Sequence, residues 1–210
     1  MRHFILTILS LLLCIYATGE SQQNNVKEAF DAKLAEYSTK NKTIECDFIH
    51  TRHLQKLTRD VTMRGKFYYN NTGEMALRYT EPKGNLILVK NGVFSMITAG
   101  KTTTAQGSSN PMLEQITNMI KACMTGDISQ LGRGWNTNYT AENGKYTIEL
   151  IPQDSRTKKY LAKIILLFNG TDMSLEKMIM QEKGENYSQY EFTHKLFNKA
   201  IDASKFELDN

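Results

Sequence analysis

The stretch GKFYYNNTGEMALRYTEPKGNLILVKNGVFSMI, residues 65–97, decides the fold of this chain. It is predicted to form four short strands separated by turns at residues 71–73, 82–84 and 91–92. The last turn is Asn-Gly, which supplies the two positive-φ positions of a type I′ hairpin. Successive side chains of a strand point to opposite faces of the sheet, so alternate positions share one face. Here one face is apolar and aromatic, and it carries Phe67, Tyr69, Met75, Leu77 and Tyr79.

Upstream of this meander, the sequence predicts one helix and one strand. Residues 22–37, QQNNVKEAFDAKLAEY, place their apolar side chains on a single stripe, which is typical of an amphipathic helix of about four turns. Residues 44–50 then alternate in polarity, which indicates a half-buried strand. His50 and His53, in this strand and the turn after it, have no carboxylate or cysteine at metal-ligand spacing. We expect both histidines on the surface.

Downstream of the meander, residues 101–109 are small, polar and turn-rich, which predicts a mobile loop. Asn110-Pro111 then begins a helix, and Gly126 ends it. The apolar stripe of this helix is rich in methionine, which suits surfaces that repack around variable apolar partners. An ordinary core-facing helix explains the same stripe, and the pattern alone favours that interpretation. The stripe comprises Met112, Leu113, Ile116, Met119, Ile120 and Cys123.

From Trp135 onward the chain is a second series of β segments. Residues 161–168 are almost continuously apolar, which predicts a strand buried on both faces. Turn residues at short, regular intervals indicate about ten strands in an antiparallel meander. We therefore expect a mainly β fold with helices (α+β), in the form of an incomplete, strongly curved antiparallel β-barrel with helices laid against it.

The composition describes one domain of ordinary size. The 210 residues are 40% hydrophobic and include only three prolines, so residues 20–210 are expected to form a single domain with a substantial core. The net charge of +4 is small, and the lysines and arginines are scattered among 22 acidic residues, which argues against nucleic acid as a partner.

The first nineteen residues have the pattern of a secretory signal peptide. Arg2 precedes an apolar run that is too short to span a bilayer, and small residues lead to a cut after Gly19. Cys14 raises a lipoprotein signal as a minor alternative, because Leu13 stands where that signal needs a small residue. We expect export and an unlipidated mature protein that begins near Glu20.

No catalytic or metal-binding motif stands out in the sequence. It contains no H-E-x-x-H, C-x-x-C or G-x-S-x-G motif and no nucleotide-binding fingerprint. Cys46 and Cys123 remain after export, and either a disulfide or two buried thiols is compatible with this spacing. We therefore expect no enzyme activity, no metal and no cofactor.

The order of these elements resembles the LolA family of periplasmic outer-membrane lipoprotein carriers, over essentially the whole mature chain. Three pieces carry the resemblance. The aromatic strand MALRYTEP runs into T-x-P, LVKNG fits LV-x-[DN]-G, and DASKF at residues 202–206 fits a closing D-x-[SA]-K-F motif. The resemblance to the LolA family rests on the order and spacing of these three pieces taken together.

The resemblance implies a hydrophobic cavity, covered by helices, that shields lipoprotein acyl chains in the periplasm. It also implies a monomer without cofactor that receives cargo from an inner-membrane lipoprotein-releasing transporter and passes it to an outer-membrane acceptor. Each acyl CH₂ kept from water contributes ~0.8 kcal/mol, so such a carrier needs apolar surface and no chemistry. The implied cavity residues are Ile44, Cys46, Phe48, Phe67, Tyr69, Met75, Leu77, Tyr79 and Leu88. The implied lid residues are Met112, Ile116, Met119 and Ile120.

One departure concerns the arginine in a K-R-P turn that ties the closed lid in well-studied carriers. The corresponding turn here is NNTG at residues 70–73, and Arg78 lies within a strand, so that role is not carried over. Three alternatives to the carrier stay open. They are a membrane-attached LolB-like acceptor or an envelope lipid or lipoprotein sensor of the same fold, a secreted binding domain without a cavity, and, last, an enzyme.

Overall fold

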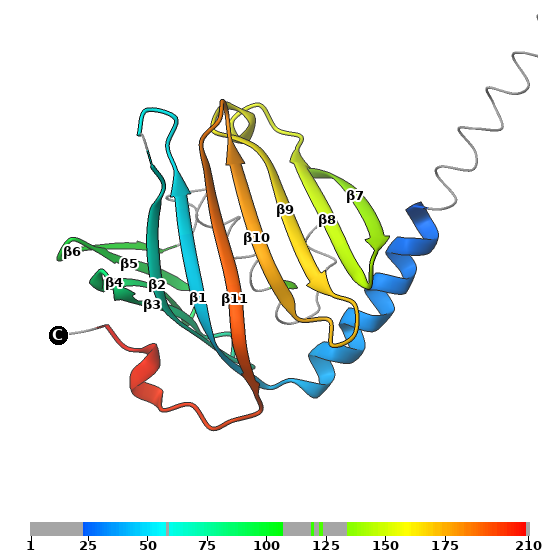
Figure 1. Cartoon of the computed structure of the whole chain (residues 1–210). Coiled ribbons are helices and arrows are strands. Elements are labelled where there is room, and N and C mark those ends of the chain that lie inside the picture. Colours follow the sequence, from blue (N-terminus) through cyan, green and yellow to red (C-terminus); the bar gives the residue numbers. More distant parts are fainter. Residues whose placement is uncertain (1–22, 58, 107–118, 120–121, 124–133, 209–210) are drawn as a thin grey trace, which may run out of the picture.

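The structure is a computed structural model that describes residues 23–57, 59–106, 119, 122–123 and 134–208. These residues form a helix over residues 23–40 and one antiparallel sheet of eleven strands (Figure 1). The predicted signal peptide and its cleavage site lie outside the described residues. Within them, no helix has the length and apolarity that a membrane span requires.

The sheet consists of two meanders joined through β1. The first meander contains β1 (Thr43–His53), β2 (Val61–Asn70), β3 (Met75–Glu81), β4 (Lys83–Lys90), β5 (Val93–Thr98) and β6 (Lys101–Gln106). The second contains β7 (Trp135–Glu142), β8 (Lys145–Pro152), β9 (Leu161–Asn169), β10 (Leu175–Glu182) and β11 (Tyr187–Phe197). Two short 3₁₀ helices are η2 (Thr157–Lys159) and η3 (Ala203–Phe206).

The strand order is β6-β5-β4-β3-β2-β1-β11-β10-β9-β8-β7. The first strand lies in the middle, because β1 pairs antiparallel with both β2 and β11. The edges β6 and β7 are not paired with each other in the described part of the chain, so the sheet is open. The predicted class, a mainly β, open and curved antiparallel fold, is confirmed.

The sheet bends where β2 passes Gly65. Figure 1 shows β3–β6 turned across the direction of β7–β11. The register between β2 and β3 shifts between Arg64 and Gly65. A Cβ at residue 65 would lie 2.3 Å from the Arg78 carbonyl oxygen and 2.5 Å from the Phe48 ring, so only glycine permits this approach. A bulge beside a glycine bends a strand and increases its twist, which turns one half of the sheet toward the other.

The helix over residues 23–40 confirms the predicted amphipathic segment. Its buried stripe is Phe30, Leu34 and Tyr37. The Phe30 ring lies 5.0–5.8 Å from three aromatic ring centroids on β7, β8 and β9, and these belong to Tyr139, Tyr146 and Phe168. The helix therefore packs across the second meander (Figure 1).

Burial alternates along most strands, and this corrects one prediction. In β1, Ile44, Cys46, Phe48 and His50 are buried and the residues between them are half-buried, as expected for a half-buried strand. In β9, burial on both faces was wrong, because only alternate positions such as Ile164 and Leu166 are buried. The opposite face of β9 carries an ion pair between Lys163 Nζ and Glu149 at 2.6 Å, and such a pair belongs to a solvated surface.

The β4–β5 turn confirms the type I′ prediction, since Asn91 and Gly92 have φ of 52° and 75°. The predicted loop at residues 101–109 is wrong over Lys101–Gln106, which forms the edge strand β6 and pairs with β5. Three consecutive threonines explain the strand, because β-branched side chains favour extended backbone. Residues 107–109 lie outside the described part of the chain.

The C-terminal segment crosses the face of β3 and β4 opposite the main core. Phe206 of η3 is buried there in a second hydrophobic cluster with Tyr68, Ala76, Leu86, Leu88 and Ile97. Asp202 caps η3 by accepting a hydrogen bond from the Ser204 N–H at 2.8 Å. The D-x-[SA]-K-F motif is therefore a capped turn that delivers an aromatic anchor.

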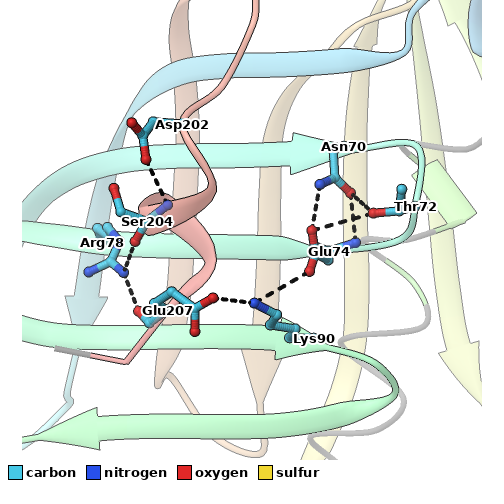
Figure 2. A network of polar contacts seen from close by, with 8 residues as sticks. All are labelled: Asn70, Thr72, Glu74, Arg78, Lys90, Asp202, Ser204 and Glu207. Atoms are coloured by element: carbon cyan, nitrogen blue, oxygen red, sulfur yellow. Dashed lines mark hydrogen bonds and ion pairs between the residues drawn. The ribbon is translucent and has the colours of Figure 1, made fainter. Parts of the chain in front are cut away.

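Arg78 and Lys90 hold this segment in place, as Figure 2 shows. Arg78 Nε donates to the Lys205 carbonyl at 2.9 Å, and its Nη2 donates to the carbonyls of Ser204, at 3.1 Å, and Glu207. Lys90 lies between the carboxylates of Glu74 and Glu207. Arg78 thus anchors the C-terminal segment to β3.

Candidate functional site

A pocket of about 360 Å³ lies between the two halves of the sheet, within the size range of small-molecule sites. Its walls come from β1–β5 on one side and from β10 and β11 on the other. The apolar lining residues are Met63, Met75, Leu77, Leu86, Ile87, Phe94, Met96, Ile97, Met178 and Met180. The lining residues with polar groups are His50, Arg52, Tyr79, Asn85, Thr98, Ser188 and Tyr190.

Methionine dominates the apolar wall. Among the described residues, five methionines line this pocket: Met63, Met75, Met96, Met178 and Met180. Methionine has three rotatable side-chain bonds and a polarisable sulfur, so a methionine wall can adapt to apolar ligands of different shape. The pocket is therefore built to accept apolar groups without fixing their geometry.

Strand alternation and register assemble this wall. On β3, Met75, Leu77 and Tyr79 are two residues apart and share a face. On β10, Met178 and Met180 do the same. The pairing of β1 with β2 sets His50 opposite Met63, and the pairing of β10 with β11 sets Met178 opposite Tyr190.

His50 is a buried ionisable side chain in the wall of the pocket. It is 8% exposed, its ring stacks on Tyr190 at a centroid distance of 4.1 Å, and its Nδ1 lies 3.0 Å from the Tyr79 hydroxyl. Its Nε2 is buried and has no hydrogen-bond partner among the residues that the structure describes. Burial, with a smaller effect from Arg52, lowers the pKa of His50 to about 4, so the imidazole is neutral at pH 7.

Arg52 follows two residues later on β1 and brings a charge to the same pocket. Its Nη1 donates to the Ser188 hydroxyl at 2.7 Å and lies 2.6 Å from a carboxylate oxygen of Glu182. The positive charge of Arg52 is therefore balanced by Glu182. With His50 neutral, this end of the pocket is polar but carries no net charge at pH 7.

The sequence comparison decides the family. The family model described as outer membrane lipoprotein carrier protein LolA matches residues 39–209. This chain belongs to the LolA family. Membership supports a lipoprotein-binding, carrier-like role in general. No curated protein sequence matches the chain.

Several solved structures have a similar fold. A DUF1329 family protein from Desulfovibrio piger has 10% sequence identity and a TM-score of 0.48, over 87% of this chain and 97% of that chain. A LolA superfamily protein from Nitrosomonas europaea has 10% identity and a TM-score of 0.42, over 83% and 96%. The lipoprotein LppX of Mycobacterium tuberculosis has 13% identity and a TM-score of 0.44, over 83% and 98%.

The cavity residues implied by the LolA resemblance separate into three groups. Met75, Leu77 and Tyr79 line the pocket. Five others are buried in the main core and are not among the lining residues, and these are Ile44, Cys46, Phe48, Phe67 and Tyr69. Leu88 is not among the lining residues of this pocket, and it packs with Phe206 in the second hydrophobic cluster.

The lid of the LolA resemblance falls largely outside the described residues. Met112, Ile116 and Ile120 lie there, so their role as a lid stays a prediction. Met119 is described, and it is helical and buried in the main core together with Ala122 and Cys123.

Sequence reasoning missed part of the pocket. His50 was expected on the surface, which is wrong, and Met63, Met96, Met178 and Met180 were not singled out. The signal for His50 was present, because it shares its strand parity with buried residues of β1. The signal for Met178 and Met180 was weaker, since their position depends on pairings between distant strands.

Thiol and metal chemistry find no support in the described residues. Cys46 and Cys123 are free and buried, which resolves the open choice between a disulfide and two thiols. Burial raises the pKa of both thiols to about 12, so neither is an activated nucleophile. No group of three His, Cys, Asp or Glu side chains in the described part of the chain could hold a metal ion.

Proposed function

We propose that this protein is a periplasmic carrier that moves lipoproteins from the inner to the outer membrane. It would bind the acyl chains of each lipoprotein in the methionine-lined pocket. The observation that carries the proposal is this pocket, in a chain whose family is that of lipoprotein carriers. An inner-membrane lipoprotein-releasing transporter would supply the cargo, and an outer-membrane acceptor would receive it.

The physical basis is transfer of acyl chains out of water. Each buried CH₂ contributes ~0.8 kcal/mol, so even part of one chain is held with substantial affinity. A pocket of about 360 Å³ accepts part of an acyl group as it stands, and its methionine side chains can move to enlarge it. Reversible binding suits a carrier, because cargo must leave as well as enter.

Mass spectrometry of the protein purified from its native envelope tests the proposal. We expect co-purified acylated peptides in a 1:1 complex. A synthetic triacylated lipopeptide should bind the purified protein and displace the neutral fluorescent probe N-phenyl-1-naphthylamine.

A pair of variants assigns the binding to the pocket. Met96 is half-buried and lines the pocket, so Met96→Glu should abolish lipopeptide binding while the protein stays folded. Leu196 is 49% exposed and lies outside the pocket, so Leu196→Glu should bind as the wild type does. Lipopeptide that fails to bind wild-type protein, or binds Met96→Glu unchanged, would contradict the proposal.

A further inference from the structure

His50 brings an unsatisfied polar atom to the wall of the pocket. Its side chain is more than nine-tenths buried, and its Nε2 has no hydrogen-bond partner in the described part of the chain. A buried polar group without a hydrogen bond is destabilising, by an amount comparable to the loss of a bond. Such a group in a binding pocket points to a ligand that completes it.

The neighbours of His50 fix which kind of ligand atom it can meet. His50 Nδ1 and the Tyr79 hydroxyl are 3.0 Å apart, and which of the two donates depends on the tautomer of His50. We assign the donated proton to the hydroxyl, because a phenol is a good donor and a neutral imidazole nitrogen a good acceptor. The proton of the neutral ring then resides on Nε2, which becomes a donor. The missing partner is therefore a hydrogen-bond acceptor such as a carbonyl oxygen.

The charges around His50 favour a neutral acceptor. The charged groups near it are Arg52 on the same strand and Glu182 at the end of β10, and these two pair at 2.6 Å. The other side chains that pack against His50, Tyr79 and Tyr190, have pKa values that burial raises, so both are uncharged at neutral pH. An anionic carboxylate or phosphate would enter this site with no uncompensated cation to meet it.

We infer that His50 Nε2–H, with Arg52 beside it, binds the ester or amide carbonyl that joins an acyl chain to its neutral glyceryl or amino group, while the chain occupies the methionine-lined pocket. This inference rests on the proposed function and adds the chemical class that the pocket selects: acyl esters and amides, in preference to free fatty acids. Nε2 has no exposed surface in the structure, so the carbonyl reaches it as a neighbour moves. The neighbour that moves is Met63, which lies opposite His50 in the sheet and has a flexible side chain.

Two lipids that differ only in the carbonyl test this inference. The ester 1-palmitoylglycerol and the ether 1-O-hexadecylglycerol have the same chain length and head group, and both are measured by displacement of N-phenyl-1-naphthylamine. One hydrogen bond corresponds to about a 3- to 10-fold preference for the ester in wild-type protein. Palmitate at pH 7.5 should bind more weakly than the ester.

Variants of the site and a matched control locate the preference. In His50→Phe the ester preference should disappear, with affinity for the ether retained. In Tyr79→Phe, which keeps the ring but removes the hydroxyl that orients His50, the preference should shrink. His53, paired with Asp60 and outside the pocket, supplies the control, so His53→Phe should keep the full preference.

The possible results distinguish a failure of the His50 inference from a failure of the proposed function. If both lipids bind wild-type protein equally, or if His50→Phe and Tyr79→Phe keep the ester preference, the inference is overturned and the lipid pocket stands. If neither lipid displaces the probe, the proposed function fails, and the inference fails with it. Palmitate that binds more tightly than the ester would overturn the claim of a neutral site.

Discussion

The two halves of the sheet bury the same kind of surface in different ways. Under the helix, the half formed by β7–β9 is filled by interlocking aromatic rings around Phe30, with centroid distances of 5.0–5.8 Å. Between β1–β5 and β10–β11, methionines surround a pocket of about 360 Å³. Rigid rings fill one region, and flexible side chains leave space in the other.

The difference shows how one continuous sheet can both stabilise the fold and bind a ligand. Close packing of aromatic side chains gives stability, because dispersion contacts and burial are both maximal. Methionine gives up some of that stability for adaptability. We therefore expect the packed half to set the stability of the molecule and the pocket half to set its binding.

The largest effect should come from placing a charge in the close-packed core rather than in the wall of the pocket. Phe67 is fully buried, with its ring 5.6 Å from that of Phe192, so Phe67→Glu should unfold the protein. Met96→Glu should leave it folded, because residue 96 is half-buried beside the pocket. Circular dichroism of the two variants checks this. A folded Phe67→Glu protein would mean that the core around Phe67 is open rather than close-packed.

Truncation should show the same contrast on a smaller scale. Phe30→Ala should lower the free energy of unfolding by about 3–5 kcal/mol, since it leaves a cavity among three rings. Met63→Ala should cost only about 1 kcal/mol, because the half-buried side chain already borders a pocket. Urea denaturation measures both. Equal losses would remove the distinction between the packed half and the pocket half.

Acid should weaken the pocket half through His50. Its pKa is lowered from 6.5 to about 4 by burial, so the unfolded state takes up a proton before the folded state does. The contribution of neutral His50 is therefore complete above pH 6.5 and is lost as the pH falls toward 4, by up to about 3 kcal/mol. His50→Phe should flatten this part of the stability profile between those pH values. An unchanged slope in the variant would assign the acid sensitivity to other groups.

The smallest effect should follow a change outside both regions. Lys90 joins Glu74 and Glu207 at the C-terminal segment, and all three side chains are partly exposed (Figure 2). Lys90→Met should cost less than about 1 kcal/mol, as is usual for surface ion pairs. Lipopeptide affinity, measured by probe displacement, should not change. A large loss of affinity would show that the outer face communicates with the pocket.

Local sequence patterns predicted much of the fold. Three features depend only on residues close together in the chain, so the sequence alone predicted them. They are the alternation in β1, the Asn-Gly turn and the amphipathic stripe of the helix. The strand β6 was missed because polar threonines were read as a loop, although their branched side chains favour an edge strand.

The site was less predictable, because it depends on long-range geometry. Periodicity identifies which residues point inward, but it does not tell close-packed core from pocket wall. That difference follows from the bend at Gly65 and from the β1–β11 and β10–β11 pairings, which bring Met178 and Tyr190 to His50. The resemblance therefore placed Leu77 and Phe67 in one cavity, while the structure separates them.

Methyl NMR of protein labelled at its methionines tests the central claim most directly, because five of the methionines that the structure describes are in the pocket wall. A triacylated lipopeptide is titrated into the labelled protein, and the methyl resonances are followed. We predict large shifts for Met63, Met75, Met96, Met178 and Met180, and little change for Met173, which is buried in the main core outside this pocket. Shifts at Met173 with the five pocket methionines unmoved would contradict the account.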